Sequence, residues 1–174
     1  VVIQEWWGLN PQIKGVAERY AQAGYVALVP DLYRGKSTVE AAEAEHLMTN
    51  LNFGDAAGQD VRGAVMYLKA RGTKVGVSGY CMGGALTLLA AVHVPEADAG
   101  VVFYGYPPLE YIDASKIKMP LLIGQGANDP RVLKVESDEM VAAVRGNGVP
   151  VEYVVFPDEG HGFRKKENRI KAAE

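Results

Sequence analysis

The only cysteine of the chain, Cys81, lies in the stretch GYCMGG at residues 79–84. Glycines stand two positions before it and two positions after it, at Gly79 and Gly83. A nucleophile on a strained strand-to-helix turn needs small residues at both positions, because larger side chains would collide with the adjacent backbone. Such a turn also places the sulfur at a helix N-terminus, where the dipole favours thiolate. Although a free cysteine is more often an inert core residue, this spacing favours a nucleophile.

A nucleophilic thiol needs a general base, and the chain offers three histidines. His161, in the stretch DEGHGF, is the only one in a loop that follows a late apolar run. His93 lies at the end of a helical pattern, and we interpret it as structural. His46 lies on a predicted helix at 39–49 and is a candidate for a residue that faces the cleft. We therefore expect His161 to be the base.

An acid must orient that base, and Asp129, in the stretch GANDPRV, is the leading candidate. Asp158 is too close in sequence to the histidine to be its obvious partner, and Asp138 lies on a predicted helix face. Cys81, Asp129 and His161 follow one another along the chain as nucleophile, acid and base. This order is the order of the α/β-hydrolases.

The elements that must position these residues alternate along the chain. Apolar runs predict strands at 1–4, 25–31, 74–80, 99–106, 120–126 and 151–157, and helical spacing predicts helices at 11–23, 39–49, 55–71, 83–92 and 133–147. We therefore predict an α/β-hydrolase fold in a single domain, residues 1–174, with a minimal doubly wound and mostly parallel sheet of about six strands. Sites form at the carboxyl ends of such strands, where the three candidate residues fall.

The composition argues against several other classes of protein. The net charge of -3 is spread over both signs, without the basic stripe of a nucleic-acid-binding domain. No apolar run is long enough to span a bilayer, so we expect no membrane partner. A single cysteine fits a reducing compartment, and we expect a cytoplasmic location. Neither a phosphate-binding loop nor a cluster with metal-ligand spacing is visible, so no cofactor or metal is expected.

The stretches VVIQEWWGLN, YVALVPDLYRGK, GQDVRGAVMYLK and KVGVSGYCMGGALTLLAA resemble the dienelactone hydrolase family over residues 1 to about 118. The resemblance implies that Cys81 is the nucleophile, His161 the base and Asp129 the orienting acid. It also implies that Glu5 contacts the resting thiol and helps its ionisation. The oxyanion hole would then use the backbone N–H groups of Met82 and Trp6.

From about Met119 onward, PLLIGQGANDPRV and EYVVFPDEGHGFRKKENRI resemble the catalytic domain of prolyl oligopeptidases and acylaminoacyl-peptidases. Those enzymes carry serine at the elbow, where this chain carries cysteine. The chain therefore reads as a chimeric mosaic of two hydrolase branches, with a possible junction near 118–120. Both branches imply the same acid and base. Because the first residues already form a core strand, we expect a native N-terminal segment before them.

The first resemblance also implies how a substrate would bind. The family holds a substrate carboxylate with two basic side chains, but Ala42 occupies the first arginine position and His46 that of a nearby tyrosine. The second basic position survives as Arg164 or Lys165. Two tryptophans, Trp6 and Trp7, would add apolar surface beside the oxyanion site. We therefore expect short neutral esters to be preferred over anionic dienelactones.

The leading interpretation is a cysteine-dependent ester or lactone hydrolase that acts on a small molecule through a thioacyl intermediate. Its alternatives are a prolyl-oligopeptidase-like acyl or peptide hydrolase and a non-catalytic binding module on the same fold. The predicted strand at 25–31 would lie at one sheet edge, and exposed edges invite pairing with another chain. We therefore expect a homodimer.

Overall fold

The structure, a computed structural model, describes residues 1–72, 74–107 and 111–173. Within these residues, one sheet of five parallel strands has the spatial order β1-β2-β3-β4-β5. The strands are β1 (Val2–Ile3), β2 (Gly76–Tyr80), β3 (Ala99–Phe103), β4 (Leu121–Gly126) and β5 (Val151–Phe156). Because all five are parallel, their carboxyl ends meet at one edge of the sheet, and the predicted α/β class is confirmed.

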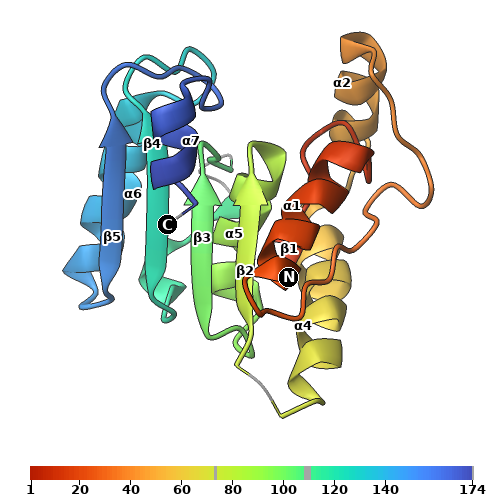
Figure 1. Cartoon of the computed structure of the whole chain (residues 1–174). Coiled ribbons are helices and arrows are strands. Elements are labelled where there is room, and N and C mark those ends of the chain that lie inside the picture. Colours follow the sequence, from red (N-terminus) through yellow and green to blue (C-terminus); the bar gives the residue numbers. More distant parts are fainter. Residues whose placement is uncertain (73, 108–110, 174) are drawn as a thin grey trace.

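Helices cover both faces of this sheet, as the strand–helix alternation predicts. The helices of the described residues are α1 (Pro11–Gln22), α2 (Ala41–Thr49), α3 (Phe53–Asp55), α4 (Arg62–Lys69), α5 (Met82–His93), α6 (Lys134–Gly146) and α7 (Lys166–Lys171). A π-helical segment, Ala56–Val61, joins α3 to α4, and a short 3-10 helix spans Ala114–Lys116. Figure 1 shows α1 and α7 in front of the sheet and α4, α5 and α6 behind it. The sheet is therefore doubly wound.

The prediction of a sixth strand at 25–31 is wrong. This segment lies beside β1, where the Val2 N–H donates to the Leu28 carbonyl at 2.9 Å, but it forms no ladder. Two physical reasons account for this: β1 is only two residues long, and Pro30 has no N–H to donate. Tyr25 is 66% exposed, so the segment borders solvent. The homodimer expected from this edge stays a prediction.

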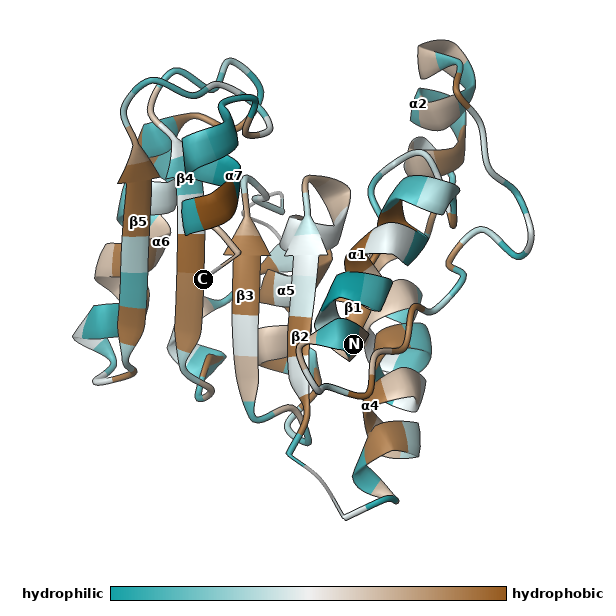
Figure 2. Cartoon of the chain, viewed as in Figure 1, coloured by the Kyte–Doolittle hydropathy of each residue, from teal (hydrophilic) through white to brown (hydrophobic). Residues whose placement is uncertain are grey.

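The core is centred on α5, whose residues from Met82 to Ala91 are all buried. The helix packs on β1, β2 and β3, and Figure 2 shows that β3, β4 and β5 are largely apolar as well. A helix that is apolar on all sides must be enclosed by other elements. Its N-terminus, which follows Cys81 directly, is therefore held rigidly against the carboxyl ends of the central strands.

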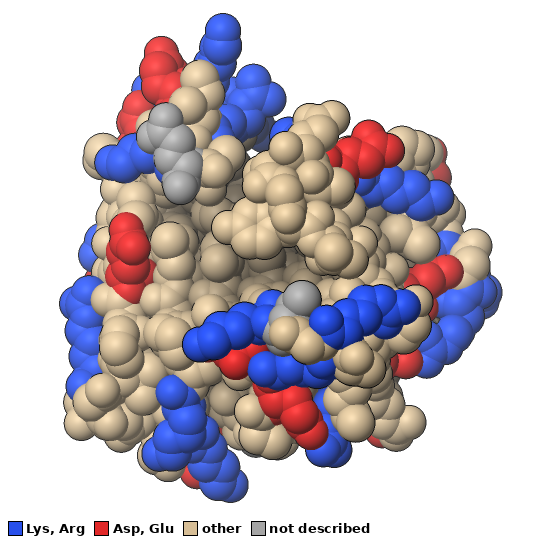
Figure 3. Space-filling model, turned by 60° about the horizontal axis from the view of Figure 1, so that its bottom comes forward, with Lys and Arg blue, Asp and Glu red and all other residues tan. Residues whose placement is uncertain are grey.

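The surface carries charges of both signs. Figure 3 shows one face on which Lys and Arg side chains lie around the rim together with Asp and Glu, while uncharged residues occupy its hollowed centre. No helix within the described residues is long and apolar enough to cross a membrane.

Candidate active site

Cys81 lies on the predicted strained turn between β2 and α5. Its φ of 54° and ψ of -117° fall in a region that side chains larger than glycine rarely adopt. Its backbone N–H donates to the Phe103 carbonyl at 3.0 Å, which fastens the turn to β3. Such strain persists only where the surrounding structure enforces it, and it is typical of functional sites.

The two flanking glycines are sterically required, as the sequence pattern indicates. A Cβ atom on Gly79 would lie 2.0 Å from the carbonyl oxygen of Gly83, and a Cβ atom on Gly83 would lie 2.6 Å from the carbonyl oxygen of Ile3. No side chain fits at these distances. The turn that displays the Cys81 sulfur therefore depends on glycine at both positions.

The thiol of Cys81 is protonated at neutral pH. Burial raises its pKa to about 11, and the negative charge of Glu5 acts in the same direction. A hydrogen bond from the backbone of Met82 and the positive charge of Arg131 oppose this rise. The helix N-terminus favours thiolate, as the sequence indicates, but burial and the Glu5 charge outweigh it, which agrees with the resting thiol that the family resemblance implies.

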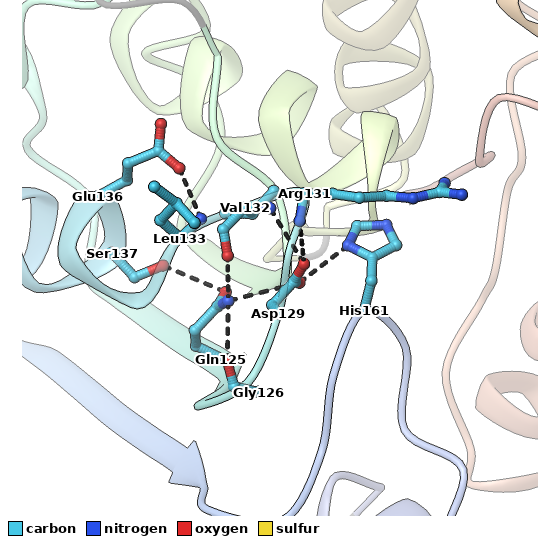
Figure 4. A network of polar contacts seen from close by, with 9 residues as sticks. All are labelled: Gln125, Gly126, Asp129, Arg131, Val132, Leu133, Glu136, Ser137 and His161. Carbon is cyan, nitrogen blue, oxygen red and sulfur yellow. Dashed lines mark hydrogen bonds and ion pairs between the residues drawn. The ribbon is translucent and has the colours of Figure 1, made fainter.

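His161 and Asp129 meet although they are 32 positions apart. The Nδ1 atom of His161 lies 2.8 Å from Oδ2 of Asp129 (Figure 4). The other oxygen, Oδ1, accepts the backbone N–H groups of Arg131 at 2.8 Å and Val132 at 3.0 Å. The Asp129 side chain is fully buried. Since a carboxylate can only accept, the Nδ1 of His161 donates, and the ring is held in a single orientation.

The second ring nitrogen of His161, Nε2, is buried and has no hydrogen-bond partner among the described residues. His161 and Cys81 line the same cavity, whose volume is about 1040 Å³. With Nδ1 protonated, Nε2 carries the lone pair. This arrangement provides a basic nitrogen next to a cavity that also contains a thiol, which is what a general base requires.

Glu5 lies at the start of the loop that follows β1 and interacts electrostatically with both Cys81 and His161. Burial raises the pKa of its carboxyl group, while a hydrogen bond with Gln12 and the charge of His161 lower it. Its charge in turn raises the pKa of Cys81. The structure therefore places Glu5 within electrostatic reach of the thiol and the imidazole.

Two further residues expected at the site line the cavity, namely Trp6 and Met82. Met82 is the first residue of α5, and its backbone lowers the pKa of the Cys81 thiol. Its side-chain sulfur accepts a hydrogen bond from the Tyr33 hydroxyl at 3.2 Å. The loop at 31–36 thus holds the first turn of α5 through this hydrogen bond.

Four expected substrate-binding residues are not among the described residues that line this cavity: Trp7, His46, Arg164 and Lys165. Trp7 packs edge-on against Trp6, with ring centroids 5.0 Å apart. His46 contacts Asn50 on the outside of α2, and Lys165 pairs with Asp158. The loop after His161 bends away because buried Glu159 accepts the backbone N–H groups of Arg164 and Lys165.

Sequence reasoning missed Arg131, which is the only Lys or Arg among the described residues that line the cavity. Its guanidinium carbon lies 5.3 Å from the centre of the Trp6 ring, a cation–π distance. The signal was available, since Arg131 stands two positions after Asp129 in a loop at the carboxyl end of a strand. Sequence reasoning also missed Tyr104, whose ring packs edge-on against His161 at 5.2 Å.

The described residues contain no group of three or more His, Cys, Asp or Glu side chains that could hold a metal ion. Cys81 and His161 line one cavity, and His161 is hydrogen-bonded to Asp129, which is the arrangement that a nucleophile, its base and an orienting acid require. Such a set transfers acyl groups.

Comparisons with known proteins point to one family of hydrolases. The model of the family described as "Dienelactone hydrolase family" matches residues 1–174, including the half that resembles peptidases. A protein of Aquifex aeolicus, named provisionally as a carboxymethylenebutenolidase, is 35% identical over 173 residues, which cover 94% of this chain and 75% of that protein.

One match is local and strong. Dipeptidyl aminopeptidase BIII of Pseudoxanthomonas mexicana is 64% identical over 55 residues, which cover 32% of this chain and 8% of that protein.

Among solved structures, one from Klebsiella pneumoniae, named provisionally as a dienelactone hydrolase, superposes with a TM-score of 0.86 at 24% identity. It covers 99% of this chain and 81% of that chain, and supports the fold.

Proposed function

Because the chain belongs to the dienelactone hydrolase family, a family of carboxylic ester hydrolases, we propose that it cleaves esters or lactones with Cys81 as nucleophile. One observation carries this proposal. The Nδ1 atom of His161 is hydrogen-bonded to Asp129, and its Nε2 is buried and has no partner among the described residues. The His161 ring lines the same cavity as the Cys81 thiol. The unpaired nitrogen is the atom that would accept the thiol proton.

In the proposed reaction, the Cys81 sulfur attacks the carbonyl carbon and its proton passes to Nε2 of His161. The carbonyl electron pair moves onto oxygen, which accepts hydrogen bonds from the backbone N–H groups of Met82 and Trp6. The tetrahedral intermediate expels the alcohol or enol oxygen, which takes the proton from His161. Water then attacks the thioester, its proton passes to His161, and the acid product and the free thiol are released.

The leaving group limits which substrates can react. A thiolate is itself a good leaving group, so the tetrahedral intermediate returns to substrate unless the alcohol departs equally well. This argument favours activated esters and enol lactones over amides. The apolar rings and side chains around the cavity, among them Trp6 and Phe53, suit a small acyl or aryl group.

The decisive experiment measures hydrolysis of p-nitrophenyl acetate by the wild-type chain and by Cys81→Ala and His161→Ala variants. Each variant should lose about three orders of magnitude in kcat/KM, since triad members act as a unit. Cys81→Ser should retain a small fraction, as the peptidase-like half resembles enzymes with serine at the elbow. The matched control is His93→Ala, at the exposed end of α5, which should hydrolyse the ester normally.

Full activity of the Cys81→Ala variant would refute the mechanism. A wild-type chain that binds esters without cleaving them would support the alternative of a non-catalytic binding module.

A second candidate function rests on the local identity to a dipeptidyl aminopeptidase. It predicts cleavage of aminoacyl p-nitroanilides at rates comparable to those of the esters. The cysteine at the elbow argues against this, for the leaving-group reason given above. Comparison of the ester and the anilide of the same acyl group separates the two functions.

A further inference from the structure

Gln125, near the end of β4, is a buried amide that directly underlies the Asp129 loop. Its Nε2 donates to the carbonyl oxygen of Val132 at 2.8 Å and to that of Gly126 at 3.2 Å. Its Oε1 accepts the hydroxyl of Ser137, on α6, at 3.2 Å. One side chain thus connects the strand, the loop that carries the acid, and the following helix (Figure 4).

The strongest of these bonds reaches Asp129 through one intermediate residue. The Val132 N–H donates to Oδ1 of Asp129, and the Val132 carbonyl accepts from Gln125. Residue 132 is therefore held from both sides, between the carboxylate and the amide. In addition, Nε2 of Gln125 lies 3.5 Å from Oδ2 of Asp129, the oxygen that faces His161.

Only an amide satisfies this set of partners. The Val132 and Gly126 carbonyls need donors, whereas the Ser137 hydroxyl donates and needs an acceptor. The hydroxyl therefore fixes which way the amide points. A carboxylate at position 125 would turn an oxygen toward the two carbonyls. An apolar side chain would leave the Val132 carbonyl without its donor, whereas the Gly126 carbonyl would keep the bond from the Asp129 N–H at 3.3 Å.

We infer that Gln125 is a positioning residue for the catalytic acid, with Ser137 fixing its orientation. It acts through Val132, whose carbonyl it holds while the Val132 N–H donates to Asp129. This fixes the position of the Asp129 carboxylate and therefore the geometry of its hydrogen bond to His161. This inference rests on the proposed function, in which Asp129 orients the base.

The test compares Gln125→Met and Ser137→Ala with a matched control, Tyr153→Phe. The Tyr153 hydroxyl donates to Asp138, the residue after Ser137 on α6, at 2.8 Å. This control therefore also removes a side-chain hydrogen bond to α6, but it leaves the Asp129 loop unchanged. Hydrolysis of p-nitrophenyl acetate gives kcat and KM. The NMR resonance of the His161 Nδ1 proton gives the state of the His161–Asp129 bond without reference to activity.

Gln125→Met should lower kcat about ten- to a hundredfold, because a displacement of about 1 Å in a catalytic group costs up to about a hundredfold. KM should change little, and the Nδ1 proton resonance should shift or disappear. Ser137→Ala should show the same changes at a smaller size, about two- to fivefold in kcat. Tyr153→Phe should lower the melting temperature alone.

The inference is overturned if both network variants keep the wild-type kcat and Nδ1 resonance while melting earlier, as the control does. If Gln125→Met does not fold, Ser137→Ala decides by the same readouts. Failure of the proposed function would appear differently, as activity that survives in Cys81→Ala. In that case the Nδ1 resonance still reports whether Gln125 positions Asp129.

Discussion

A Cβ atom on Gly126 would lie 2.3 Å from the carbonyl oxygen of Gly160. Gly126 ends β4, just before the loop that carries Asp129, and Gly160 immediately precedes His161. The backbones that carry the acid and the base therefore touch, with no room for a side chain between them. This approach is what brings the imidazole within 2.8 Å of the carboxylate.

Gly126→Ala should consequently push the His161 loop away from β4. We expect kcat/KM for p-nitrophenyl acetate to fall by about a hundredfold or more, the scale of a 1 Å error in a catalytic group. The close contacts that shape the elbow are with Gly83, Ile3 and Gln4 rather than with Gly126, so Cys81 should still react with iodoacetamide.

The matched control for this substitution is Gly63→Ala, within α4, where a Cβ atom would meet nothing within 4 Å. This variant should keep its activity and gain about 0.5–1 kcal/mol of stability from helix propensity. Equal activity of the two alanine variants would contradict the steric argument.

Glu5→Gln should make Cys81 more acidic. The Glu5 charge raises the pKa of the thiol, so its removal should lower that pKa and move the alkylation profile to lower pH. At pH 8 the rate with iodoacetamide should rise about two- to fivefold, somewhat less than the gain in thiolate, because nucleophilicity falls with pKa.

Stopped-flow alkylation across pH 6–11 measures the profile, which in the wild type should still be rising toward its midpoint of about 11 at the upper end and in the variant should rise at lower pH. Ester hydrolysis should fall in the same variant if Glu5 also takes part in activating the thiol. An unchanged alkylation profile would show that Glu5 does not act on the thiol.

Arg131→Gln should have the opposite effect on the thiol. The Arg131 charge lowers the pKa of Cys81, so alkylation by iodoacetamide at pH 8 should slow by about twofold, a modest effect because the side chain is exposed and screened by solvent. Iodoacetate, which is anionic, should slow more, by about fivefold at low salt, because it also loses electrostatic attraction.

Arg71→Gln is the control, since Arg71 stacks on Tyr67 beyond the end of α4 and does not line the cavity. The ratio of the two alkylation rates should not change in this variant. If the ratio also stays constant in Arg131→Gln, Arg131 does not attract anions into the cavity.

Substrate charge should influence turnover. Arg131 is the only Lys or Arg among the described residues that line the cavity, where the family resemblance implies a pair of basic side chains. The absence of one charged contact should weaken recognition of a carboxylate about tenfold to a hundredfold. We expect kcat/KM for a neutral p-nitrophenyl ester to exceed that for a carboxylate-bearing dienelactone at matched pH and salt. A clear preference for the dienelactone would refute this expectation.

The sequence was sufficient for features that depend on near neighbours in the chain. The elbow is one, because the collision that requires Gly79 occurs with Gly83, four positions further along the chain, and the glycine spacing itself marks the turn. The collision that requires Gly83 is with Ile3 on β1 and depends on the fold. The parallel sheet is another, since apolar runs and helical spacing are local patterns. The rule that sites lie at the carboxyl ends of strands then selected the loops of Cys81, Asp129 and His161.

The tertiary structure decided what depends on distant segments. It showed that 25–31 forms no strand, because its pairing partner β1 is too short. Hydrogen bonds from the backbone of Arg164 and Lys165 to buried Glu159 keep these two residues away from the cavity. The fold places Arg131 at the cavity instead. Burial, which sums contributions from the whole fold, raised the pKa of Cys81, although the helix N-terminus lowers it. Cavity shape, burial and electrostatic neighbours come from segments tens of residues apart, and no local pattern encodes them.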